Sequence, residues 1–113
     1  MVPESADATP VARASVVLFA RYQAVLADAA DFPSAADGCT RAHLLWMCTT
    51  ATEQAPSWPD DKTSRWLGFV QGVMTMQGLL TVAGEREFSR PLFHAAYAEQ
   101  GNVAPASMAP PPA

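Results

Sequence analysis

The cysteines and histidines are the side chains of this 113-residue sequence that could bind a metal ion. Cys39 and His43 are four residues apart, so both can lie on one face of a helix, and His94 could add a third ligand. Structural zinc sites use four ligands, which usually come as two closely spaced pairs. The sequence holds one such pair and no second, so we expect neither a metal ion nor another cofactor. Cys48 is expected to be a free, buried core residue.

The residues that catalysis would require are also poorly placed. A nucleophile needs a neighbouring base that an acid orients, and the sequence shows no strand-to-helix nucleophile turn and no glycine-rich phosphate loop. Glu85 and Glu87 lie on different faces of a regular helix, so they are poor partners for acid–base chemistry. We therefore expect that the protein is not an enzyme.

A stripe of basic side chains suggests a binding function instead. Arg86, Arg90 and His94 are spaced four and four, and they lie near Phe93 and Tyr97 on a continuous helix. Arginine beside aromatic residues is typical of protein interfaces. The same stripe could grip phosphates, or it could form ordinary surface ion pairs with neighbouring acidic residues.

Two further side chains complete the candidate partner-binding residues. Trp46 falls off the apolar stripe of its helix, where it is either a second packing surface or an exposed anchor for a partner. Arg65 follows Asp61 by four residues, a spacing that favours an ion pair within a helix.

Helices must position these residues, because apolar residues recur with a helical period and no long stretch alternates with period two. We predict an all-α fold, a compact bundle of four helices near residues 10–30, 40–54, 58–79 and 82–100. Residues 1–9 are expected to form a disordered arm, 10–101 a single helical domain, and 102–113 a disordered tail rich in proline and alanine.

Local signals set the expected helix ends. Thr9 before Pro10 and Thr81 at the fourth segment are typical N-caps, and Ser57 with Asp60 resembles a capping box that starts the third helix. Pro91 should kink the fourth helix or divide it into two short ones.

The third helix has two different faces. Gly68 and Gly72 belong to a face of small or polar residues, and each costs roughly 1 kcal/mol relative to alanine. We predict that another helix backbone approaches them closely and that the third helix lies at the centre of the fold. The fourth segment is the favoured neighbour, and a second copy of the chain in a two-fold dimer is the alternative. The other face is wide and apolar, and it should be covered as well, with Trp66 in the core; it comprises Trp66, Phe69, Val70, Val73, Met76 and Leu80.

Composition excludes several classes of protein. The formal net charge is −4, and Lys62 is the single lysine, which argues against a general phosphate-binding surface and makes nucleic acid an unfavoured partner. No stretch approaches 18 apolar residues, so we expect no membrane span. Glu4 and Asp7 stand where a secretory signal would carry positive charge, so we expect a cytoplasmic protein.

The run from Asp61 to Gly72, Asp-Lys-Thr-Ser-Arg-Trp-Leu-Gly-Phe-Val-Gln-Gly, resembles a segment of small phage and prophage proteins. Glu85-Arg86-Glu87 and the run from Arg90 to His94 resemble its continuation, so the resemblance covers residues 58–97. At Thr81–Gly84 the sequence departs from the more acidic pattern of that group.

The resemblance implies a gene of a mobile element. Small acidic phage proteins often bind a host protein, so the expected function is a protein–protein interaction that inhibits or adapts host machinery, as an anti-CRISPR or other anti-defence protein does. A nucleic-acid-binding regulator of a mobile element is the alternative.

Overall fold

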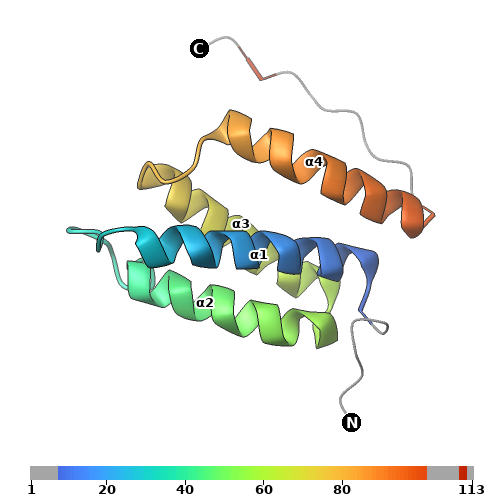
Figure 1. Ribbon diagram of the computed structural model, residues 1–113, viewed down its shortest axis with the longest axis horizontal. Coiled ribbons are helices and arrows are strands. Elements are labelled where there is room, and N and C mark those ends of the chain that lie inside the picture. Colours follow the sequence, from blue (N-terminus) through green and yellow to red (C-terminus); the bar gives the residue numbers. More distant parts are fainter. Residues whose placement is uncertain (1–7, 102–109, 112–113) are drawn as a thin grey trace.

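The computed structural model describes residues 8–101 and 110–111, and over those residues it contains four α-helices and no strand (Figure 1). The helices are α1 (Pro10–Asp28), α2 (Arg41–Gln54), α3 (Asp60–Met76) and α4 (Val82–Glu99), and a short 3-10 helix, Ala55–Ser57, joins α2 to α3. The predicted all-α bundle is confirmed. Most of the expected arm at 1–9 and tail at 102–113 lies outside the described residues. No helix within the described ranges is long and apolar enough to cross a lipid bilayer.

Threonine side chains start three of the four helices. Thr9, Thr40 and Thr81 each accept a hydrogen bond from the backbone N–H three residues later, at 3.0, 3.1 and 3.0 Å. The predicted starts of the first, second and fourth helices are therefore confirmed. Thr9 was assigned to the arm, and its hydroxyl also donates to Asp60 Oδ1 at 2.6 Å.

The third helix is slightly shorter than the predicted 58–79, and its predicted capping box is wrong. The Ser57 hydroxyl donates to the Gln54 carbonyl oxygen at 2.9 Å within the 3-10 helix, so it forms no capping box and α3 begins at Asp60. At the other end Gly78 adopts a φ of +78°, and the Leu79 N–H donates to the Met74 carbonyl oxygen at 2.9 Å. This glycine conformation ends the helix and turns the chain toward α4.

The fourth segment is a single helix that continues through Pro91. Of the two alternatives left open by the sequence, two short helices are excluded. Gly101 follows its end with a φ of +80°, which confirms the expected C-terminal glycine.

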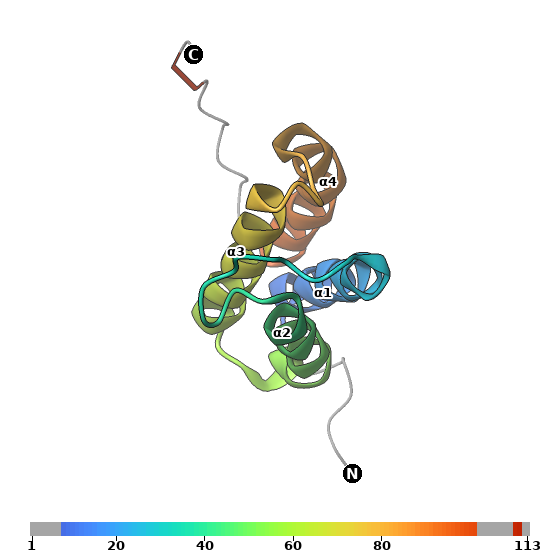
Figure 2. The same cartoon turned by 90° about the vertical axis from the view of Figure 1, so that its left-hand side faces the viewer.

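The central helix of the bundle is α1, and the prediction that α3 occupies this position is wrong. α1 packs against α2, α3 and α4, with α2 and α4 on opposite sides of it and α3 behind (Figures 1 and 2). The main core lies between α1, α2 and α3, and its fully buried large side chains include Phe19, Tyr22 and Leu44. A smaller cluster around Val11, Ala14 and Ala96 joins α1 to α4.

The buried stripe of α3 differs from the predicted one. Its buried residues are Thr63, Leu67, Val70 and Met74, whereas Phe69 is 43% exposed and Met76 is 86% exposed. The large side chains of α3 surround more of the helix than α1 and α2 can cover, so part of the apolar surface stays outside. The predicted apolar face was chosen by side-chain size, and it therefore included Phe69 and Met76, which remain exposed to solvent.

No element of the described fold fills the small face of α3. Gly68 and Gly72 are exposed, and a Cβ atom built on either would meet no neighbouring atom within 4 Å. The favoured prediction, that the fourth segment packs onto these glycines, is therefore wrong because α4 packs on α1 instead. A second copy of the chain stays a prediction.

Gly72→Ala should stabilise the protein by about 0.5–1 kcal/mol, because alanine is the better helix former and its methyl group meets open space. A helix backbone in close contact with Gly72, as the sequence predicts, would instead make the added methyl group destabilising. Gly78→Ala is the matched control and should destabilise by about 1 kcal/mol, because Gly78 has a φ of +78°. Urea unfolding of the wild type and the two variants measures both changes in the free energy of unfolding. A destabilised Gly72→Ala would contradict the open face.

Candidate protein-binding site

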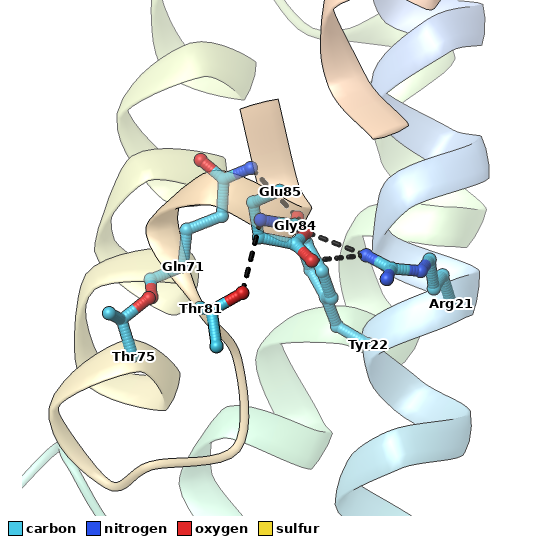
Figure 3. A network of polar contacts seen from close by, with 7 residues as sticks. All are labelled: Arg21, Tyr22, Gln71, Thr75, Thr81, Gly84 and Glu85. Atoms are coloured by element: carbon cyan, nitrogen blue, oxygen red, sulfur yellow. Dashed lines mark hydrogen bonds and ion pairs between the residues drawn. The ribbon is translucent and has the colours of Figure 1, made fainter. Parts of the chain in front are cut away.

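A buried polar network fixes the start of α4 against α1 (Figure 3). Glu85 lies in the first turn of α4, where the helix dipole favours a carboxylate. Arg21 Nη1 lies 2.6 Å from both carboxylate oxygens of Glu85, and the Tyr22 hydroxyl donates to Oε1. Gln71 of α3 donates to the same hydroxyl through Nε2 at 2.8 Å. The network therefore connects three helices at one point.

The electrostatics of the network favour a structural role. Desolvation and the hydrogen bond to Glu85 raise the pKa of Tyr22 above its ordinary value of 10.0, so the phenol stays neutral. The hydrogen bond to Glu85 raises the pKa of Arg21 as well. The guanidinium carbon of Arg21 also lies 4.2 Å from the centre of the Phe88 ring. The guanidinium of Arg21 therefore lies between the Glu85 carboxylate and the Phe88 ring, and it compensates the charge of Glu85.

Two hollows lie on either side of the exposed edge of α3. The first, which we call the α3–α4 hollow, has a volume of about 650 Å³ and lies between Gly72 and Met76 of α3 and Val82 and Phe93 of α4. The second, the loop hollow, has a volume of about 450 Å³ and lies between α3 and residues 34–39. Gly72 and Met76 line both hollows, so the two form one continuous surface.

Large apolar side chains stand exposed on this surface. Met76 is 86% exposed, Val82 64% and Phe69 43%. We call the surface formed by Phe69, Gly72, Met76 and Val82 the α3–α4 face. Exposed apolar side chains that adjoin one another mark interaction sites more often than scattered single ones. The sequence analysis missed this face because it placed Phe69 and Met76 in the core. The one signal that could have found it is the excess width of the apolar surface of α3.

Trp46 and Arg65 lie outside the α3–α4 face. Trp46 is 54% exposed, and its ring centre is 5.7 Å from that of Trp66 and 5.4 Å from that of His43, so one part of the ring packs on neighbours while the rest faces solvent. Both alternatives for Trp46, a packing surface and an anchor for a partner, stay predictions. Arg65 is exposed and faces Asp61 at 3.7 Å, which is the ion pair that the spacing predicts. Neither residue lines one of the two hollows.

The basic stripe of α4 lies in solvent. Arg86, Arg90 and His94 are all exposed, and the two arginines line a third hollow of about 430 Å³ together with Glu87. The acidic side chain within this hollow reduces its positive charge. Arg86 alone among the predicted partner-binding residues also lines the α3–α4 hollow.

The potential metal ligands do not come together. Over the described ranges no three His, Cys, Asp or Glu side chains are close enough to hold a metal ion. Cys39 is half-buried beside the loop hollow and His94 is exposed on α4. Cys48 is buried as predicted, and this burial raises the pKa of its thiol to about 12, so it is not a ready nucleophile.

Comparison of the chain with protein-family models, with curated proteins and with solved structures finds no match. The resemblance of residues 58–97 to phage and prophage proteins therefore stays a prediction, and the function has to be argued from the surface of the chain itself.

Glu85→Gln should destabilise the protein by about 2 kcal/mol, because it leaves Arg21 without its carboxylate and weakens the acceptor of the Tyr22 hydroxyl. Glu87→Gln is the matched control on the same helix; its side chain is exposed, so the loss should stay below about 1 kcal/mol. Urea unfolding at neutral pH measures both. Equal losses in the two variants would show that the network does not hold α4.

Proposed function

We propose that this chain is a non-enzymatic protein that acts by binding another protein through the α3–α4 face. The observation that carries the proposal is the exposure of Met76. Its side chain is 86% exposed and lies between the two hollows, next to Gly72, which has no side chain to cover α3. An apolar side chain in this position gains free energy when a partner covers it. Val82 and Phe69 extend the apolar surface to either side.

The shape of the face suits an incoming helix. Gly68 and Gly72 are one turn apart and carry no side chain, so a partner backbone can approach α3 closely there. The hollows beside them can take apolar side chains that an amphipathic helix presents at helical spacing. Contact with such a helix would offset the helix stability that the two glycines cost. No contact within the described part of the chain offsets it.

The basic stripe supports the nucleic-acid alternative less well. The chain has a net charge of −4, and Glu87 lies beside the two arginines of the stripe. A phosphate-binding surface needs a local excess of positive charge that this composition does not favour. We therefore take a protein as the partner.

The identity of the partner is a narrower part of the proposal. The expectation that it is a host protein, and that the chain inhibits or adapts host machinery as an anti-defence protein in the host cytoplasm, rests on the resemblance of residues 58–97 alone. The binding face rests on the exposure of Met76 and on the two hollows, not on that resemblance.

Capture from bacterial lysate with immobilised variants tests the proposal. The wild-type chain should recover a partner in roughly stoichiometric amount, and Met76→Glu should reduce recovery roughly tenfold, because it places a charge in the contact. Val17→Glu is the matched control: Val17 is 46% exposed on α1 and lines neither hollow, so recovery should be unchanged. No stoichiometric partner, or equal recovery with Met76→Glu, would refute the proposal.

A further inference from the structure

We infer that the α3–α4 hollow binds an acidic amphipathic helix of the partner, with an apolar side chain in the hollow and a carboxylate paired with Arg86. The inference rests on the proposed function and adds the chemistry of the partner. It is carried by the charge of the hollow, by one buried hydroxyl group, and by the spacing of the residues along α4.

The charge of the hollow is positive although the protein as a whole is acidic. Glu85 lines the hollow, but Arg21 already neutralises its carboxylate and the Tyr22 hydroxyl donates a hydrogen bond to it. Arg86 is exposed at the same hollow, and within the described ranges no carboxylate forms an ion pair with it. Glu87 lines the neighbouring hollow rather than this one. The uncompensated charge here is therefore a guanidinium, which a partner carboxylate matches through paired hydrogen bonds.

A polar group at the same place lacks a partner. Ser89 lines the α3–α4 hollow, and its Oγ is buried without a hydrogen bond. A buried hydroxyl that is left unpaired costs free energy. Ser89 lies one helical turn after Arg86 on the side of α4 that borders the hollow, so its hydroxyl adds an unpaired polar group close to the guanidinium.

The order of residues along α4 defines the orientation of these groups. Val82, Arg86, Ser89 and Phe93 are spaced four, three and four, so they lie on one face of α4 that borders the hollow. Apolar groups therefore stand at both ends of this row, with the cation and the hydroxyl between them. Gly72 and Met76 of α3 form the opposite wall. A helix in this hollow would place its acidic residue between two apolar contacts.

A second copy of the chain does not fit these requirements. In a two-fold dimer the patch meets itself, so Arg86 would face another α3–α4 face whose Glu85 is already paired with its own Arg21. The free guanidinium would gain no carboxylate. The predicted homodimer is therefore not the occupant that we propose.

Peptide selection on the full-length chain tests the inference. A displayed library of random peptides, each long enough for about four helical turns, is panned against the wild-type protein. The affinity of the enriched peptides is then measured by fluorescence anisotropy with Arg86→Glu, Met76→Glu and, as a charge-matched control, Arg65→Glu. Arg65 also carries an exposed guanidinium, but it lies outside the hollow.

We expect enriched peptides with apolar residues at helical spacing around an Asp or Glu. Arg86→Glu should weaken the binding of these peptides roughly tenfold or more, whereas Arg65→Glu should weaken it less than about threefold. Replacing the acidic residue of the peptide with lysine should restore binding to the Arg86→Glu variant. Enrichment of basic or neutral peptides, or failure to enrich any, would overturn the inference, and so would a wild-type chain that sediments as a dimer through this face.

The two proposals fail in different ways. If Met76→Glu abolishes peptide binding but Arg86→Glu does not, the inference of an acidic partner is wrong, whereas the α3–α4 face stays a binding surface. Peptides insensitive to both substitutions would overturn the proposed function as well.

Discussion

The contact of Arg21 and Tyr22 with Glu85 determines where α4 lies, and the surface of the protein depends on it. α4 buries only two of its own residues, Glu85 and Ala96, so apolar burial alone holds it weakly. At its other end a small apolar cluster with Val11 and Ala14 is joined by polar contacts: Arg13 pairs with Glu99, and the Val11 N–H donates to Gln100 at 3.1 Å. The carboxylate of Glu85 is largely buried, so α4 has to lie where Arg21 and Tyr22 can compensate its loss of water. We regard this as the reason that α4 packs on α1 at a defined position.

That position leaves one edge of α3 open. Gln71 contacts the network from α3 and also lines the α3–α4 hollow together with Gly72, the next residue. The polar network and the apolar face are therefore adjacent parts of one arrangement. The glycines cost helix stability without any return inside the described chain, and Met76 and Val82 leave apolar surface in water. A partner helix would account for both costs together.

The parts of the fold that could be predicted from the sequence depend on neighbouring residues. Thr9 with Pro10, Thr40 and Thr81 mark helix starts because capping is decided within three residues. The stripe of α2, formed by Leu44, Met47, Cys48 and Ala51, is buried as predicted because these residues recur with a helical spacing. The parts that failed depend on distant residues. Arg21 and Glu85 are 64 residues apart, and no local pattern pairs them. Trp66, Val70, Val73 and Leu80 of the predicted apolar face are buried or pack against the core, as expected. Phe69 and Met76 are larger than Thr63, so side-chain size favoured them as core residues although they are exposed and Thr63 is buried. Arg86 was found because its exposure follows from charge alone.

The orientation of α3 is the central claim, and oxidation of its two methionines tests it most directly. Met74 is fully buried and Met76 is 86% exposed, although only one residue separates them. Dilute hydrogen peroxide converts accessible methionine to the sulfoxide, and peptide mass spectrometry can follow each residue in the native protein. We predict that Met76 oxidises at least about tenfold faster than Met74, and that the difference disappears in urea as the protein unfolds. Equal rates in the native protein, or protection of Met76, would contradict the open α3–α4 face on which the proposed binding depends.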